Sequence, residues 1–341
     1  MSDTSAGAAA DTDCDVLFIG AGPVGLFGAF YAGLRGLSVT LMDALPAPGG
    51  QISAMYPEKE ILDVAGFPRV KGRDLVDGLV AQVEPYKPQY LLEQQASSMR
   101  ADGDVVSVET ATGTVVRARG VVLTGGIGSF SPKPLPAAAD WAGGGVLHFV
   151  ERPAELSGLD LVIVGGGDSA IDWALMLTPL ARSLTLVHRR NRFRAHAAMV
   201  DRVRDLGVPF LVPGEVTRLV PGPDGRLAGV EVTCTSGRGK DATSQVVDVA
   251  CQTVIAALGF HAELGPLADW GLPVSGRHIE VGPTCATGVP HVYAAGDLVT
   301  YPGKVALLAT GFGEVATAVN NLAAELDPSI SVFPGHTSEM T

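Results

Sequence analysis

Short apolar runs, glycine turns and longer stretches of small and apolar residues follow one another in a repeating order along the chain. The apolar run Asp15–Ile19 predicts a strand, the residues after the glycine turn predict a helix to about Gly36, and Ser38–Met42 predicts a second strand. The same order returns as the strand Leu161–Val164, a helix to about Leu177 and the strand Leu184–Val187. Strands that alternate with helices are typical of parallel sheets, so we expect an α/β fold with two similar units.

The similarity continues into hairpins that follow each unit. Asp104–Thr110 and Thr114–Arg117 flank the turn residues Thr112-Gly113, and Val121–Thr124 then predicts one more strand. The second unit repeats these elements as Leu227–Thr235, Gln245–Val249 and Thr253–Ala257. We therefore expect two Rossmann-like dinucleotide-binding domains, each with a parallel sheet, covering helices and a β-meander.

Proline-containing segments indicate where the chain passes from one domain to the other. Ser131–Pro136 marks a first crossing and Val281–Pro283 a second one, so one domain is inserted into the other. The sequence thus predicts a disordered N-terminus at 1–13, a discontinuous first domain at 14–130 and 283–341, and a second domain at 131–282.

Composition and charge narrow the class of protein. The chain of 341 residues is 47% hydrophobic and 18% charged, which is typical of a globular protein with a buried core. Its formal net charge of −12 argues against nucleic-acid binding, and no apolar run approaches the ~20 residues of a membrane span. The first residues carry no positive charge and no apolar block, so we expect no secretory signal in them.

Four cysteines lie far apart in the sequence, at Cys14, Cys234, Cys251 and Cys285. No pair has the C-x-x-C spacing of a zinc or redox site, and no cysteine–histidine cluster is present in the sequence. We therefore expect reduced thiols, no metal site and a cytoplasmic protein.

The first glycine turn has the fingerprint of a dinucleotide site. Gly20, Gly22 and Gly25 stand at G-x-G-x-x-G spacing between a predicted strand and helix, with Pro23 inside the turn. The acidic residue Asp43 follows the second strand, where the fingerprint has its ribose ligand. Free N–H groups at a helix N-terminus favour a pyrophosphate, so we expect a dinucleotide here.

The second glycine turn has the same plan, but the residues after its second strand are basic where the first unit has an acidic residue. The turn and the start of its helix consist of Gly165, Gly166, Gly167, Asp168, Ser169 and Ala170, and the fingerprint tolerates alanine at the third glycine position. His188 stands where the first unit has Asp43, and it is followed by Arg189, Arg190, Arg192 and Arg194. Guanidinium groups suit the 2′-phosphate of NADP, so we expect the two turns to bind different dinucleotides.

A third motif comes after the second unit. The predicted strand from His291 ends in Gly296-Asp297, and a long alanine-rich helix follows to about Leu326. An aspartate at such a strand end can accept a hydrogen bond from a ribityl hydroxyl. We expect the helix N-terminus near Lys304–Ala306 to face the N1/C2=O edge of a flavin, where negative charge develops on reduction.

Together these motifs resemble those of two-domain flavoproteins with the thioredoxin reductase fold, and among them the ferredoxin–NADP reductases of the thioredoxin-reductase-like type. The resemblance extends from about Cys14 to Ser338. It is carried by the motifs Pro48–Gln51, Leu62–Pro68, His188–Arg194, Tyr301–Lys304, Thr310–Glu314 and Phe333–His336. Thioredoxin reductases have a redox C-x-x-C before the second glycine turn, whereas Val146–Glu151 of this chain contains no sulfur.

The resemblance implies FAD in the first domain, NADPH in the second, a homodimer, and ferredoxin or flavodoxin as the electron carrier. A hydride passes from NADPH to flavin N5 and single electrons pass on, so no catalytic side chain is required. The positions that match the family's FAD contacts are Asp43, Gln51, Tyr56, Ala96, Phe130, Asp297 and either Thr337 or Ser338. Tyr56 is expected to stack on one face of the flavin and His336 to cover the other.

Two other functions remain open. A flavin disulfide reductase for a small external disulfide could also lack the C-x-x-C, and a flavin- and NADP-binding redox sensor would need no turnover. Docking of an acidic ferredoxin would require a local basic patch. The stretch that could supply it contains Lys59, Arg69, Lys71, Arg73 and Lys87.

Overall fold

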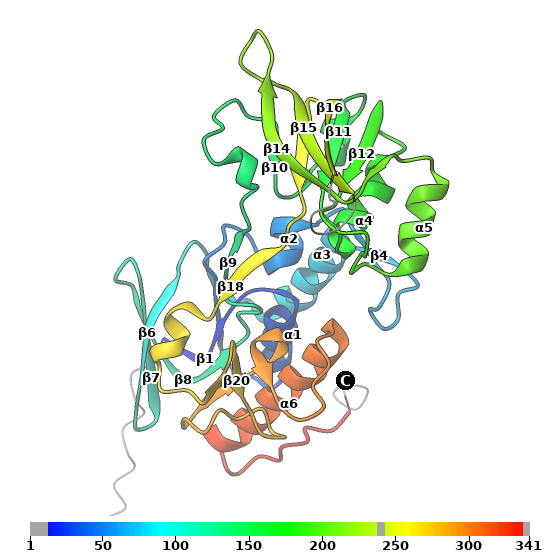
Figure 1. Ribbon diagram of the computed structural model, residues 1–341. Helices are drawn as coiled ribbons and strands as arrows, with labels where there is room; N and C mark the ends of the chain where they lie inside the picture. The colour runs from blue at the N-terminus through cyan, green and yellow to red at the C-terminus, as the bar shows by residue number, and fades with distance from the viewer. Residues whose placement is uncertain (1–12, 237–242, 337–341) are drawn as a thin grey trace, which may run out of the picture. The chain divides into compact units, whose positions relative to one another are not determined.

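The structure, a computed structural model, describes residues 13–236 and 243–336, and the chain divides into two compact units. Unit 1 contains the residues up to Ser129 and those from Ala262 onward, whereas unit 2 contains Phe130–His261. Both units combine sheets with helices (Figure 1), so the predicted α/β class is confirmed.

Unit 1 is built on a seven-stranded sheet. Its strand order is β5 (Gln89–Leu91), β2 (Val39–Met42), β1 (Cys14–Ile19), β8 (Val115–Leu123), β7 (Val105–Thr110) and β6 (Ala96–Asp102), with β21 (Val292–Ala294) also paired to β8. The β6–β7 and β7–β8 pairs are antiparallel, and the other pairs are parallel. The sequence predicts two strands where β8 is one, because β8 continues from its hairpin with β7 into its pairing with β1.

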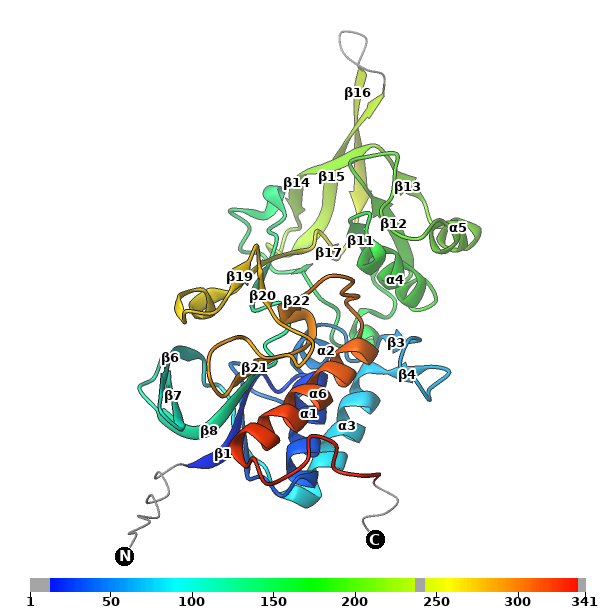
Figure 2. The ribbon, with the colours of Figure 1, turned by 90° about the horizontal axis from the view of Figure 1, so that it is seen from below.

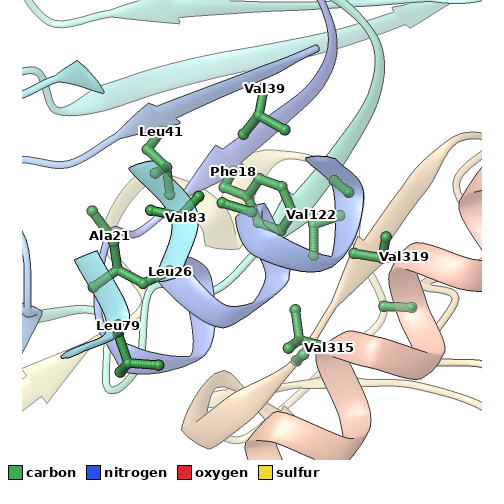
Figure 3. Packing of buried hydrophobic residues seen from close by; sticks show 14 of the residues in the cluster. Phe18, Ala21, Leu26, Val39, Leu41, Leu79, Val83, Val122, Val315 and Val319 are labelled. Carbon is green, nitrogen blue, oxygen red and sulfur yellow. The ribbon is translucent and has the colours of Figure 1, made fainter. Parts of the chain in front are cut away.

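Three helices of unit 1 share one apolar core with the sheet: α1 (Pro23–Leu34), α3 (Gly72–Val83) and α6 (Leu308–Leu326). Figure 2 shows α6 lying alongside α1. The buried residues Val315, Val319 and Leu322 recur at helical spacing and give α6 its apolar face. In Figure 3, Val315 and Val319 of this face approach Phe18 of β1 and Val122 of β8.

The opposite face of the sheet is covered by residues that the sequence assigns to the other domain. Leu17 of β1 alternates with Phe18 and points to this second face, where it clusters with Leu264, Trp270 and Ile279. The covering segment includes the short strands β19 (Val274–Ser275) and β20 (His278–Glu280), and β20 pairs with β22 (Val299–Thr300) of the first predicted domain. The predicted second crossing near residue 283 is therefore wrong, because the chain has already returned to unit 1 at Ala262.

The two crossings pair with each other as β9 (Ser129–Pro132) and β18 (Phe260–Glu263). Three further short elements belong to unit 1: α2 (Gly50–Met55) and the antiparallel pair β3 (Glu60–Ile61) and β4 (Val70–Lys71).

Unit 2 contains a parallel five-stranded sheet and an antiparallel three-stranded one. The order in the parallel sheet is β10 (Val146–Leu147), β17 (Thr253–Ala256), β11 (Asp160–Val164), β12 (Ser183–Val187) and β13 (Phe210–Leu211). The antiparallel sheet contains β14 (Gly214–Pro221), β15 (Leu227–Ser236) and β16 (Thr243–Ala250). The helices of this unit are α4 (Asp168–Leu177) and α5 (Ala197–Asp205).

The parallel parts of the two sheets are equivalent strand for strand. Strands β5, β2, β1, β8 and β21 of unit 1 correspond in order to β13, β12, β11, β17 and β10 of unit 2. The register agrees as well, because Ile19 pairs with Met42 and Val164 pairs with Val187. The residues that follow these pairs, Asp43 and His188, therefore hold the same position in the two units.

Close packing of α1 generates a first prediction about stability. A Cβ on Gly28 of α1 would lie 2.5 Å from both Phe18 and Val315, so Gly28→Ala should lower the free energy of unfolding of unit 1 by about 1–3 kcal/mol. Gly78 in α3 is the matched control, because no atom lies within 4 Å of its Cβ position. Gly78→Ala should raise stability by up to about 1 kcal/mol. Urea unfolding followed by circular dichroism measures both, and equal midpoints for the two variants would contradict this packing.

Candidate functional site

The first glycine turn joins β1 to α1 with no room for side chains at two of its positions. Gly20 has φ 114°, and a Cβ on it would overlap the carbonyl oxygen of Thr124. A Cβ on Gly25 would overlap the carbonyl oxygen of Gly20 itself. At Gly22, by contrast, the nearest atom would be the Cα of Gly50, 3.9 Å away. Packing explains the outer two glycines, and the space beside Gly22 fits a phosphate that approaches the backbone.

Asp43 follows β2 and holds this turn from the side, as predicted from its position. Its Oδ2 accepts a hydrogen bond from the N–H of Ala21 at 2.7 Å, and its Oδ1 accepts one from Leu45 at 2.9 Å. Burial raises the pKa of Asp43, while the hydrogen bonds oppose that rise. Each carboxylate oxygen can accept more than one hydrogen bond, so Asp43 retains capacity for a ribose hydroxyl.

The start of α2 packs directly on the first glycine turn. The N–H of Gly49 donates to the carbonyl of Ala21 at 2.8 Å, and a Cβ on Gly50 would lie 3.0 Å from the Cα of Gly22. The next residue, Gln51, extends its Nε2 to 3.0 Å from the Cβ position of Gly126, just beyond β8. Figure 2 shows α2 at the same end of the sheet as the start of α1. The residues Gly20–Gly25, Asp43 and Gly50-Gln51 together form what we call the unit-1 cradle.

The Gly296-Asp297 turn lies against this cradle. A Cβ on Gly296 would lie 3.4 Å from Val24, which belongs to the first glycine turn. Burial raises the pKa of the Tyr56 hydroxyl, and the nearby negative charge of Asp297 raises it further. The ammonium of Lys59 lies 5.9 Å from the centre of the Tyr56 ring. The structure therefore brings Tyr56 and Asp297 together at one end of the unit-1 cradle.

A buried carboxylate beside this turn was not singled out from the sequence. Glu314 of α6 is 6% exposed, and its Oε2 accepts the N–H of Gly296 at 2.8 Å. Its Oε1 accepts the hydroxyl of Tyr301 at 2.6 Å and pairs with the ammonium of Lys304. A sequence signal existed, because Glu314 is spaced four residues before Ala318 and eight before Leu322 on the apolar face of α6.

The remaining predicted FAD contacts do not belong to the unit-1 cradle as defined above. Ala96 begins β6, two residues after Gln94, whose N–H donates to the carbonyl of Asp43 at 2.9 Å. Phe130 belongs to β9, and its flavin contact stays a prediction. Thr337 and Ser338 lie outside the described residues.

His336 lies on the C-terminal tail, whose earlier part is anchored away from the glycine turn. Arg35 caps the far end of α1 and donates to the carbonyls of Ser331 and Val332. The ring of His336 packs on Phe333, with centroids 5.3 Å apart. The expected cover of the second flavin face by His336 stays a prediction.

The second glycine turn joins β11 to α4 and repeats the crowding of the first. A Cβ on Gly165 would overlap the carbonyl oxygen of Ala257 and lie 3.0 Å from the Cβ of Ala170. The helix begins at Asp168, whose Oδ1 accepts the N–H of His196 at 3.4 Å, and Ser169 follows. Ala170 is fully buried at the third glycine position, so alanine fits there.

The basic loop after β12 folds back over this turn. The N–H of Arg194 donates to the carbonyl of Gly166 at 2.7 Å, and its guanidinium reaches to 3.5 Å from the Cβ position of Gly167. The His188 ring covers Gly166 so closely that a Cβ there would overlap it. Burial, together with the charges of Arg189, Arg190 and Arg194, lowers the pKa of His188. The positive charge of this loop at neutral pH therefore belongs to its arginines.

These arginines have no acidic partner within the part of the chain that the structure describes. Arg189, Arg190, Arg192 and Arg194 are all exposed, and none forms an ion pair with a described carboxylate. Unpaired guanidinium groups at the mouth of a glycine turn are suited to a phosphate ester.

Comparison with known proteins agrees with this arrangement. Residues 14–321 match the family model described as pyridine nucleotide-disulphide oxidoreductase. A protein of Salinispora tropica named ferredoxin–NADP reductase is 57% identical over 330 residues, which cover 96% of this chain and 99% of that protein. A protein of the same name from Thermus thermophilus is 45% identical, over 95% and 96% of the two chains. The chain belongs to the ferredoxin–NADP reductase family.

The fold of this family member is also that of a solved structure, the thioredoxin reductase of T. acidophilum. The two superpose with a TM-score of 0.76 at 22% identity, over 92% of this chain and 99% of the other. At this identity the likeness shows a common fold.

The basic stretch beside the cradle of this ferredoxin–NADP reductase family member is largely neutralised. Arg69 pairs with Glu60 at 3.3 Å, while Lys71 and Arg73 pair with Glu58 at 3.2 and 2.5 Å. The antiparallel register of β3 and β4 sets Glu60 opposite Lys71 and brings these charges together. Three of the five cations of the predicted basic patch therefore have acidic partners, and the patch itself stays a prediction.

Three of the four thiols in this chain are buried. Burial raises the pKa of Cys14, that of Cys251 to about 12 and that of Cys285 to about 11. A thiol is nucleophilic as its thiolate, so none of these three is prepared to attack a disulfide at neutral pH. Within residues 13–236 and 243–336, no cluster of metal-ligating side chains is found, and no helix has the length and apolar character to cross a membrane.

Burial generates a labelling prediction. Iodoacetamide at neutral pH should modify the half-buried Cys234 first and leave Cys251 and Cys285 unmodified in the folded protein. Mass spectrometry of peptides after timed exposure gives the order, and urea-unfolded protein should label at all four positions. Early labelling of Cys285 in the folded protein would contradict the burial described above.

Proposed function

We propose that this protein transfers electrons between NADPH and ferredoxin through a bound FAD. One observation carries the proposal: the equivalent positions after β2 and β12 hold Asp43 in unit 1 and His188-Arg189-Arg190 in unit 2. A carboxylate is suited to ribose hydroxyls, whereas guanidinium groups are suited to a 2′-phosphate. The 57% identity to a protein named ferredoxin–NADP reductase supports the same function.

In this proposal the unit-1 cradle holds FAD. The backbone N–H groups of Gly22 and its neighbours at the start of α1 would bind the pyrophosphate, and Asp43 would bind the adenosine ribose. Gln51 and Asp297 would contact the ribityl and ring end, where Tyr56 would lie against the flavin. A bound flavin would supply acceptance of a hydride and release of single electrons, which side chains cannot provide.

Unit 2 holds NADPH in the same proposal. The N–H groups at the start of α4, from Gly167 to Ala170, would bind its pyrophosphate. Arg189, Arg190 and Arg194 would bind the 2′-phosphate, helped by the absence of acidic partners among the described residues. FAD as the flavin, flavodoxin as an alternative carrier, a homodimer and a cytoplasmic location belong to the proposal on the strength of the family resemblance.

A reductase of a small external disulfide is the second candidate, and the burial of Cys14, Cys251 and Cys285 is unfavourable to any version of it that uses one of these thiols. The segment before β11 contains no cysteine, and Phe149 within it stacks on Phe260 with the two rings 5.4 Å apart and nearly parallel. Together with the buried thiols, this leaves no dithiol relay between a flavin and a disulfide. A redox sensor without turnover is the third candidate.

Anaerobic reduction by NADPH tests the three candidates. The purified protein is loaded with FAD, titrated with NADPH, and then offered oxidised ferredoxin, flavodoxin and small disulfides in turn. We expect bleaching of the flavin spectrum and reoxidation by ferredoxin, both unaffected by alkylation of accessible thiols. Reoxidation by a disulfide that is lost on alkylation would favour the disulfide reductase, and a spectrum that NADPH leaves unchanged would favour the sensor.

The arginine loop generates a specificity prediction. Changing both Arg189→Gln and Arg190→Gln should weaken NADPH binding by at least about 100-fold, because each of the two charge-assisted contacts contributes about 1.5–3 kcal/mol, and should leave NADH binding nearly unchanged. Arg204→Gln is the matched control, since the Arg204 guanidinium is already paired with Asp201 at 2.9 Å. Isothermal titration calorimetry with NADPH and with NADH, which does not rely on the flavin spectrum, gives the dissociation constants that measure the effect. Equal losses for the two coenzymes would mean that the loop positions unit 2 without reading the 2′-phosphate.

A further inference from the structure

A buried ion pair lies beside the Gly296-Asp297 turn and has no role in the binding contacts described so far. The side chains of Lys304 and Glu314 are 10% and 6% exposed, and they pair directly. Through its other oxygen, Glu314 fastens the backbone of Gly296, next to Asp297. The first turn of α6 packs here too, because a Cβ on Gly311 would lie 3.4 Å from the Cα of Gly296.

A glutamate of α6 can hold a neighbouring backbone N–H and a tyrosine hydroxyl without a buried lysine beside it. Eleven positions further along α6, Glu325 accepts the hydroxyl of Tyr293 at 2.8 Å and the N–H of His291 at 3.2 Å. Glu314 makes the same two kinds of contact to Tyr301 and Gly296, but it is 6% exposed and pairs with a lysine, whereas Glu325 is 36% exposed and has the imidazole Nδ1 of His291 at 3.6 Å. Buried ion pairs seldom stabilise a fold more than apolar side chains of equal size, so the lysine invites another explanation.

We propose that Glu314 is a positioning residue that holds the ammonium of Lys304 beside the Gly296-Asp297 turn, and that the balance of these two charges sets the affinity of the flavin for electrons. This inference rests on the proposed function, because it concerns the FAD assigned there to the unit-1 cradle. Cys285 lies near both charges, but its raised pKa keeps it a neutral thiol that adds no charge to the balance.

The sign of the effect follows from electrostatics. Reduction adds negative charge to the flavin, so a positive charge that loses its counterion nearby favours the reduced form. A unit charge about 10 Å away in a partly dry site changes such an equilibrium by about tenfold. Glu314→Gln keeps an oxygen for the Gly296 N–H, loses the oxygen that accepts from Tyr301 and Lys304, and removes the negative charge. It should therefore raise the reduction potential of the flavin.

The experiment compares three variants of the FAD-loaded full chain by anaerobic spectroelectrochemical titration. Glu314→Gln should favour the reduced flavin by about tenfold, which is about 30 mV for a two-electron couple. The double variant Lys304→Met/Glu314→Gln has no buried charge left and should return toward the wild-type potential. Glu325→Gln, the matched control on the same helix, should leave the potential unchanged.

These outcomes separate a charge effect from loss of structure. If Glu314 acts only as a fastener, the single and double variants lose the same carboxylate contacts and should shift the potential alike; equal shifts would overturn the proposal. An unchanged potential in a Glu314→Gln protein that binds FAD normally would overturn it as well. Wild-type protein that takes up no FAD would instead overturn the proposed function, so the two failures are distinguishable.

Discussion

Both units depend on the close approach of a strand end to the helix that follows it. In unit 1 a Cβ on Gly25 would overlap the carbonyl oxygen of Gly20, so no side chain fits there. In unit 2 a Cβ on Gly165 would lie 3.0 Å from the Cβ of Ala170. The first turns of α1 and α4 lie at or just after these crowded positions. Because the same sheet order repeats around each turn, one geometric constraint produces two helix starts that are suited to anions in a single chain.

On this shared frame, the two units differ in the side chains at the strand ends. Asp43 is half-buried and accepts hydrogen bonds from two backbone N–H groups, so its orientation exists before any ligand arrives. The arginines after β12 are exposed and, within the described chain, without acidic partners. Preorganisation in one unit and adaptable charge in the other suit a cofactor that stays bound and a coenzyme that exchanges.

Local motifs could be predicted from the sequence because their geometry is set by neighbouring residues. The glycine turns, Asp43 after β2 and the basic loop after β12 all belong to this class. Features that depend on distant packing could not be predicted: the return to unit 1 at Ala262 follows from Leu264 and Trp270 filling the second face of the sheet. The ion pairs of Arg69, Lys71 and Arg73 with Glu58 and Glu60 depend on the pairing of β3 with β4, and Glu314 was passed over because its partners come from a separate turn.

The pairing of β9 with β18 has a consequence for the modular history of the chain. Because the strand that leaves unit 1 and the strand that returns lie side by side, the two ends of the inserted segment meet. An insertion whose ends meet can be acquired, exchanged or excised without opening the host sheet, since a short loop would reconnect β8 to the residues from Ala262 onward. A duplicated dinucleotide-binding gene fragment could thus enter its own sister at one surface connection, and each copy could then change its charge independently.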